Sequence, residues 1–274
     1  MNRRLIGLLA LACAGCGVGR APTAQPSPLV SVSAGSSTVI VSVPPVLSTP
    51  SRTSSASHSA TPGRTSAAAV PPVSAQATAA GLVDVRTVVP DAIIDLRYAT
   101  SHNFVGVPLY PADARCLVHQ SLATGLATAA AALRRQGDLL VFWDCYRPHA
   151  VQVRMFQIVP NPDWVAQPGP YARSHEAARS VDVTLARASV GASCAADQRD
   201  HGHCLLDMGT GFDDFTPRAY AFASNGVSAS AQANRTRLRL AMNAGGLAVY
   251  SGEWWHFDGP GALVGRPYLN VAVD

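Results

Sequence analysis

The N-terminal quarter of the chain lacks the residues from which protein cores are built. From residue 17 to residue 80 there is no aspartate, glutamate, lysine, phenylalanine, tryptophan or tyrosine, and serine, threonine, proline, alanine and valine dominate. Such a segment cannot bury enough apolar surface to offset the entropy of ordering its backbone. We therefore interpret 17–80 as a disordered linker and expect a folded domain at 81–274.

Lysine is absent from the whole chain, and the arginines that carry its positive charge are unevenly distributed. Five of the 21 arginines lie before residue 81, where there is no acid. The other arginines nearly balance the 17 acids, so that 81–274 carries about one negative charge although the chain has a formal charge of +4. The folded part thus lacks the basic surface that nucleic-acid binding requires. Nothing in the sequence indicates a protein partner.

The apolar run at the N-terminus is too short for a membrane span, which needs about 20 residues. Two arginines precede this run, 5–12, and small residues then lead to Cys16. The pattern resembles a bacterial lipoprotein signal in which Cys16 is lipidated. We expect 1–16 to be an export signal, and the protein to be held at the cell membrane by a lipid, facing the cell wall. Processing at Cys13 and plain secretion are the alternatives.

Four further cysteines lie in the expected domain: Cys116, Cys145, Cys194 and Cys204. Export permits disulfides, and four cysteines allow three pairings. We prefer Cys194 with Cys204, which would close a short polar loop, and hence Cys116 with Cys145. Free buried thiols are the alternative. No two of these four cysteines have a Cys-x-x-Cys spacing, which argues against a zinc site made of cysteines in the domain.

The domain mixes helical and strand patterns without regular alternation. Alanine- and leucine-rich stretches with stop signals predict helices, as does a proline at a first-turn position. The predicted helices are 120–136, 148–159 and 231–243. Apolar runs predict strands at 93–98, 139–143, 181–185, 247–250 and 254–258. This pattern favours an α+β single domain with a mostly antiparallel central sheet flanked by helices.

Three segments contain residues that a soluble domain rarely needs for packing. Segment 174–182 supplies His175 and Asp182, segment 252–258 supplies Glu253 and His256, and segment 144–148 supplies Arg147. The chain lacks a Gly-x-Ser-x-Gly motif and a phosphate-binding loop.

These residue types are the ones that metal-assisted amide hydrolysis requires. Two neutral imidazoles and a carboxylate can hold Zn²⁺ with one position open for water, whose pKa falls to about 7. His175, Asp182 and His256 would be the ligands. Glu253 would be the general base and Arg147 would stabilise the oxyanion.

Each of these residues also has an ordinary explanation when taken singly. A single histidine is more often a hydrogen-bonded residue than a ligand, and a single aspartate can cap a turn. Geometry adds a condition, because Glu253 and His256 would point to opposite faces of an ideal strand. The segment must bend, or begin in a turn, for both to reach one zinc ion at the sheet.

The motifs are similar to those of the D-alanyl-D-alanine dipeptidases, the zinc enzymes of vancomycin resistance and their relatives. The resemblance covers nearly the whole domain and includes, in order, 95–100, 103–106, 146–148, 174–185, 208–213 and 253–257. It implies the same ligands, base and arginine, with one Zn²⁺ per chain. It further implies that Asp213, with Ser174 nearby, binds the free amino group of a small D-amino-acid dipeptide.

Two features depart from this resemblance. Ala178 and Ser180 stand where the family's motif usually has glycine and alanine, and Ala178 would be costly if its backbone were left-handed. The best-known members act inside the cell on free D-Ala-D-Ala, whereas this chain has an export pattern.

The sequence therefore predicts zinc-dependent hydrolysis of D-Ala-D-Ala in cell-wall peptide metabolism. An exported zinc D,D-carboxypeptidase that trims peptidoglycan stem peptides is one alternative. A catalytically silent wall-binding lipoprotein is another.

Overall fold

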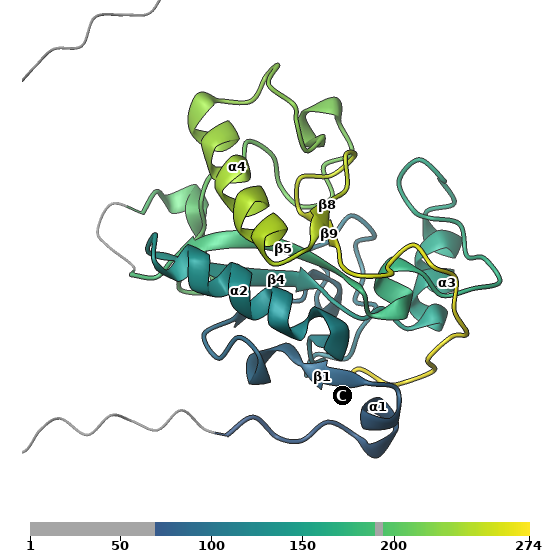
Figure 1. Cartoon of the computed structure of the whole chain (residues 1–274). Helices are drawn as coiled ribbons and strands as arrows, with labels where there is room; N and C mark the ends of the chain where they lie inside the picture. The colour runs from purple at the N-terminus through teal and green to yellow at the C-terminus, as the bar shows by residue number, and fades with distance from the viewer. Residues whose placement is uncertain (1–68, 190–193) are drawn as a thin grey trace, which may run out of the picture. The chain divides into compact units, whose positions relative to one another are not determined.

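The computed structural model describes residues 69–189 and 194–274, and the expected signal at 1–16, with Cys16, lies outside these ranges. Within them, five strands form the central sheet in the order β2-β4-β5-β9-β8 (Figure 1). The strands are β2 (Ile93–Ile94), β4 (Asp138–Asp144), β5 (Ser180–Arg187), β8 (Ala248–Val249) and β9 (His256–Asp258). Only the β2–β4 pair is parallel. The predicted α+β domain with a mostly antiparallel sheet is confirmed.

The long helices of the described residues are α2 (Ala123–Arg134), α3 (His149–Ile158) and α4 (Ala229–Ala244), of which α2 and α4 pack against the sheet. Helices α2 and α4 lie side by side, α2 against β4 and α4 against β8 (Figure 1). They approach so closely that a Cβ added to Gly125 would lie 2.2 Å from the carbonyl oxygen of Gly245. Glycine is therefore required at this crossing.

The remaining elements are short. Two two-stranded sheets pair β1 (Leu82–Asp84) with β3 (Leu117–His119) and β6 (Arg199–Asp200) with β7 (His203–Cys204). Turns of 3-10 helix are Val85–Thr87, Arg97–Ala99, Gln120–Leu122, Ser174–Ala177, Ala196–Gln198 and Pro217–Ala219.

Several predicted boundaries are wrong. The linker was predicted to reach residue 80, yet α1 (Ala75–Ala79) is a helix that is capped by Ser74 and buries Ala77. The rest of the predicted linker up to 68 lies outside the described residues. The strand predicted at 93–98 ends at Ile94, because the chain turns into the 3-10 helix Arg97–Ala99.

The strand predicted at 254–258 begins only at His256. Residues 251–255 form a turn and a bend before it, which meets the condition that the sequence set for Glu253 and His256.

Both preferred disulfides are present. Cys116 is bonded to Cys145, and Cys194 is bonded to Cys204. The first ties β3 to the end of β4, where Arg147 follows three residues after Asp144.

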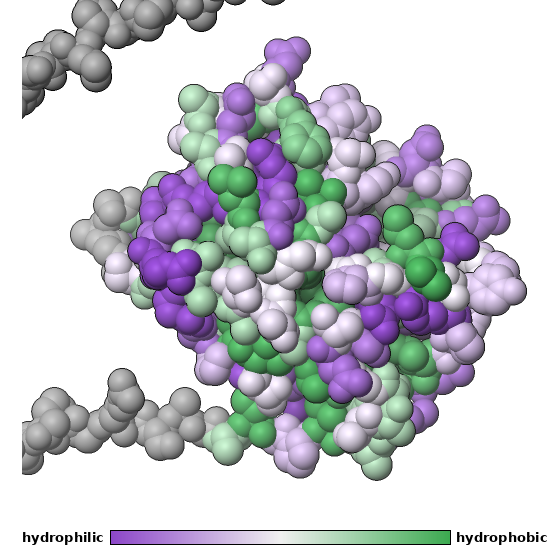
Figure 2. Space-filling model, in the orientation of Figure 1, coloured by the Kyte–Doolittle hydropathy of each residue, from purple (hydrophilic) through white to green (hydrophobic). Residues whose placement is uncertain are grey.

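On the face seen in Figure 2, hydrophilic and hydrophobic residues are interspersed over short distances, as on ordinary protein surfaces. None of the helices in the described ranges combines the length and apolar character that crossing a membrane requires.

Candidate metal centre

Adjacent strands of the central sheet bring the predicted metal ligands together. Asp182 on β5 is paired with His256 on β9, and directly opposite residues of an antiparallel pair share one face of the sheet. His175 reaches the same place from the 3-10 turn Ser174–Ala177, which precedes β5. All three side chains are buried.

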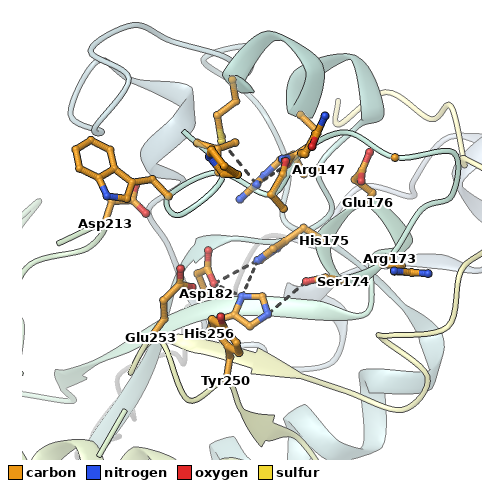
Figure 3. A pocket seen from close by; sticks show the side chains of 18 of the residues that line it. Arg147, Arg173, Ser174, His175, Glu176, Asp182, Asp213, Tyr250, Glu253 and His256 are labelled. Carbon is orange, nitrogen blue, oxygen red and sulfur yellow. Dashed lines mark hydrogen bonds and ion pairs between the residues drawn. The ribbon is translucent and has the colours of Figure 1, made fainter. Parts of the chain in front are cut away.

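The three ligand atoms face one another at distances that suit a single ion (Figure 3). His175 Nε2 is 3.1 Å from His256 Nδ1 and 3.3 Å from Asp182 Oδ1, and His256 Nδ1 is 3.0 Å from Asp182 Oδ1. Ligands about 2.0–2.1 Å from a tetrahedral zinc lie about 3.3–3.4 Å from one another. The triangle is thus only slightly tighter than a zinc site needs.

The outer hydrogen bonds decide which ring nitrogens carry protons. His175 Nδ1 lies 2.8 Å from the carbonyl oxygen of Cys145, which can only accept, so Nδ1 donates. His256 Nε2 lies 3.1 Å from Asp258 Oδ1, and it likewise donates to the carboxylate. In the neutral rings, His175 Nε2 and His256 Nδ1 are left with lone pairs.

Three lone-pair atoms therefore point at one another inside a buried site. Without a cation between them, two such nitrogens and a carboxylate oxygen repel, and a proton must enter to relieve the repulsion. Although burial opposes its charge, hydrogen bonds to Asp182 and Asp258 raise the pKa of His256 to about 10 in the metal-free protein. Burial opposes ionisation of Asp182 too, but His175 and His256 lower its pKa. The donor set fits a divalent metal ion.

Asp258 and Ser180 orient the His256 ring from the side opposite its metal-binding nitrogen. Asp258 Oδ1 accepts hydrogen bonds from both His256 Nε2 and the Ser180 hydroxyl. Ser174 Oγ lies 3.3 Å from the same nitrogen of His256, so the predicted substrate residue also touches a metal ligand. The serine that departs from the family's usual alanine at position 180 thus has a defined contact.

The predicted general base lies beside the metal ligands. Glu253 lines the same cavity and stands next to Asp182 and His256 (Figure 3). Burial raises the pKa of Glu253, although the neighbouring His256 opposes the shift. A carboxylate in this position is a stronger base than an exposed glutamate, so it takes up a proton from a nearby water more readily.

Arg147 lies across the cavity from Glu253 and is held rigidly (Figure 3). Its Nη2 donates to Asp144 Oδ2 at 2.6 Å and its Nη1 donates to Gln152 Oε1 at 2.7 Å. Asp144 is fully buried and also accepts from the hydroxyl of Tyr110 at 2.7 Å. The register of β4 on β5 shifts between Phe142 and Asp144, which sets Asp144 opposite Asp182. A bulge of this kind re-aims side chains beside a site.

Asp213 lies in the cavity wall, where Tyr98 donates a hydrogen bond to its Oδ2 at 2.9 Å. Burial, and then the charge of Asp182, raise the pKa of Asp213 well above its usual value. Three residues around the site have a left-handed backbone: Ser174, Ala178 and Asp213. Ala178 has φ 55° and ψ 27°, so the alanine in place of the usual glycine is strained there.

Sequence reasoning had assigned no role to Asp144, Asp258, Tyr98 or the carbonyl of Cys145. Two of them lie close in sequence to a predicted site residue, which is a local signal: Asp144 is three residues before Arg147, and Asp258 is two residues after His256. Tyr98 and Cys145 reach the site only through tertiary contacts.

A second group of possible ligands comprises Asp95, Asp200 and His201. Arg97 pairs with both carboxylates, and its Nη2 lies 2.7 Å from Asp95 Oδ2. The guanidinium already supplies the positive charge that a metal ion would bring, so His175, Asp182 and His256 are the better centre.

Comparison with known proteins identifies the family of the chain. Residues 78–274 match the family described as D-ala-D-ala dipeptidase. The chain belongs to this family of metallopeptidases. It is 35% identical over 181 residues to a D-alanyl-D-alanine dipeptidase of Escherichia coli (strain K12). That match covers 66% of the chain and 86% of the relative. It is 31% identical over 204 residues to a D-alanyl-D-alanine dipeptidase of Enterococcus faecium. That match covers 66% of the chain and 90% of the relative.

A third relative, the D-alanyl-D-alanine dipeptidase of Streptomyces coelicolor (strain ATCC BAA-471 / A3(2) / M145), is 30% identical over 182 residues. The match covers 60% of the chain and 83% of that protein. Members of the D-Ala-D-Ala dipeptidase family depend on a metal, and among the described residues His175, Asp182 and His256 are the group best placed to hold it.

Proposed function

We propose that the protein hydrolyses free D-Ala-D-Ala to two molecules of D-alanine, with one Zn²⁺ held by His175, Asp182 and His256. The observation that carries the proposal is the triangle of lone-pair atoms, in which Cys145 and Asp258 fix the imidazole tautomers from outside. Membership of the family supports the substrate. When bound, zinc would supply a nucleophilic water at neutral pH and positive charge for the scissile carbonyl.

The side chains of this protein perform the remaining steps. Glu253 takes a proton from the attacking water and delivers it to the amide nitrogen, so that water adds across the bond that breaks. Arg147, braced by Asp144 and Gln152, stabilises the negative oxygen that develops on the carbonyl carbon. Asp213 pairs with the substrate's ammonium group, and a substrate without that group would leave a buried carboxylate unpaired.

The direct test measures bound metal in the purified chain and D-alanine release from D-Ala-D-Ala, with and without a chelator. We expect about one zinc per chain and release that the chelator abolishes. Metal-loaded protein that leaves D-Ala-D-Ala intact would disprove the dipeptidase activity.

A D,D-carboxypeptidase is the second candidate, because the cavity is larger than the dipeptide requires. Its volume is about 610 Å³. A dipeptide of two alanines has about eleven non-hydrogen atoms and fills about 300 Å³ even at the roughly 30 Å³ that each water takes in the liquid. The remaining space lies partly against Trp164 and Phe215, whose rings stack 5.1 Å apart. Faster cleavage of N-acylated D-Ala-D-Ala than of the free dipeptide would favour this candidate.

We also propose that the protein acts outside the cytoplasm in cell-wall peptide metabolism, anchored by a lipid at Cys16. The signal-like pattern at 1–16 supports export. The two disulfides support it too, since disulfides persist in oxidising compartments. Labelling cells with a fatty-acid probe tests the anchor, because Cys16→Ser should abolish the label and release the protein. A label that persists in Cys16→Ser would point to Cys13.

A further inference from the structure

One arginine of the cavity has no partner among the residues that the structure describes. Among the described residues that line it, two are arginines, Arg147 and Arg173. Arg147 is paired with Asp144 at 2.6 Å. The exposed side chain of Arg173 forms neither an ion pair nor a hydrogen bond with any residue in the described ranges. Its positive charge is therefore available to something that enters the cavity.

The backbone holds Arg173 firmly on both sides. Ala172 and Arg266 exchange two backbone hydrogen bonds, of 2.8 and 3.0 Å, and the Ser174 amide donates to the carbonyl of Ala262 at 2.8 Å. Ser174 then takes a left-handed conformation, with φ 49°, and the next residue is the metal ligand His175. The backbone of Arg173 is thus fixed two residues before the metal ligand His175, while its exposed side chain can change conformation.

Arg173 and Asp213 lie on opposite sides of the metal centre. Figure 3 shows Asp213 on one side of His175, Asp182 and His256, and Arg173 on the other. Asp213 is the only one of the two that the sequence had singled out. A free dipeptide has the matching distribution of charge, with an ammonium group at one end and a carboxylate at the other.

We propose that Arg173 binds the C-terminal carboxylate of the dipeptide and so fixes the direction in which the substrate lies. This inference rests on the proposed dipeptidase function. With the ammonium group at Asp213 and the carboxylate at Arg173, the single amide bond of a dipeptide is centred on the metal ligands. A guanidinium suits this role, because its planar fork can donate two parallel hydrogen bonds to one carboxylate. Arg173 is then a specificity residue and takes no part in the proton transfers.

The proposal is tested with the metal-loaded full chain and two substrates, D-Ala-D-Ala and its C-terminal amide. The variants are Arg173→Gln and Arg173→Lys. The control is Arg154→Gln, which removes the same charge from an exposed position on α3 that does not line the cavity. Bound zinc is measured in each protein, so that loss of metal is not mistaken for loss of substrate binding.

We expect Arg173→Gln to lower kcat/KM for D-Ala-D-Ala about tenfold, as for the loss of one charge-assisted contact, mainly through KM. Cleavage of the amide and zinc content should not change. Arg173→Lys should recover part of the loss, and Arg154→Gln should behave like the wild type.

A decrease in Arg173→Gln that is equal for the acid and the amide, or no decrease, would overturn the role of Arg173 alone. Failure of the metal-loaded wild type to cleave D-Ala-D-Ala would overturn the proposed function, and this inference with it.

Discussion

Asp182 on β5 lies directly opposite His256 on β9, with Asp182 Oδ1 3.0 Å from His256 Nδ1. Two of the three metal ligands are therefore set by strand register, since a shift of one residue would turn one of them to the other face. The third, His175, comes from the turn that leads into β5. The centre is thus built mainly on two paired strands of the central sheet.

The roles of Glu253 and His256 separate in a pair of variants. Glu253→Ala should keep its metal and lose activity by about a thousandfold, because it removes the base without touching a ligand. His256→Ala should lose the metal itself. Metal analysis and D-alanine release in the same preparations give both readings, and an active Glu253→Ala protein would refute the assignment of the base.

Ser180→Ala should weaken metal binding about tenfold, because the loss of a group behind a ligand histidine commonly costs 10- to 100-fold in affinity. The serine hydroxyl donates to Asp258, which in turn accepts from His256. Competition with a chelator measures the effect. Thr184→Val is the control, since its hydroxyl lies buried on the same strand without a partner among the described residues. Equal affinity in Ser180→Ala and wild type would contradict this role.

The two disulfides should differ in what they support. Replacing Cys116 and Cys145 by serine should lower the free energy of unfolding by about 3 kcal/mol, and also weaken metal binding. The reason is that the carbonyl of Cys145 accepts the hydrogen bond from His175 Nδ1. Replacing Cys194 and Cys204 should lower stability without affecting the metal. Denaturant unfolding and chelator competition test both pairs, and identical metal affinity in the two double variants would be the contrary result.

Asp213→Asn should weaken substrate binding and increase the stability of the metal-free protein. Burial and Asp182 raise the pKa of Asp213 above its ordinary 3.8, so the folded state binds the proton more tightly than the unfolded state. Between 3.8 and the raised pKa, the wild type therefore loses stability as pH rises, whereas the variant lacks this loss.

In chelated protein, we expect Asp213→Asn to melt at a higher temperature than the wild type, by a margin that is larger at about pH 8 than at about pH 5. In metal-loaded protein it should lower kcat/KM for D-Ala-D-Ala roughly a hundredfold. Asp113→Asn, at an exposed position, should change neither. A margin that shrinks with rising pH would contradict the sign of the shift.

Ala178→Gly should be tolerated although Ala178 is fully buried. Relief of the left-handed strain, about 1 kcal/mol, offsets the loss of a buried methyl group and the greater freedom of glycine in the unfolded chain. We expect the free energy of unfolding to stay within about 0.5 kcal/mol of the wild type. Ala177→Gly, in the adjacent buried position without a left-handed backbone, should cost at least about 1 kcal/mol. Similar losses in both variants would rule out the strain.

The sequence by itself determined the three long helices and the residue types of the site. The alanine- and leucine-rich stretch at 120–136 becomes α2 with its 3-10 lead-in, and 231–243 becomes α4, because helix formation depends on neighbours a few residues apart. The residue types at 175, 182, 253 and 256 indicated metal-assisted hydrolysis, since few other chemistries need two histidines and two carboxylates in such motifs.

Only the tertiary structure decided how those residues face one another. The tautomer of His175 depends on the carbonyl of Cys145, 30 positions away, and Ser180 supports Asp258 across 78 positions. The turn at 251–255 that brings Glu253 and His256 to one side, and the register shift that aims Asp144, are likewise set by strand pairing. That Arg173 has no charged partner among the described residues is visible only when the cavity is assembled. These features depend on contacts between distant segments, and local sequence preferences do not encode which distant partner each side chain meets.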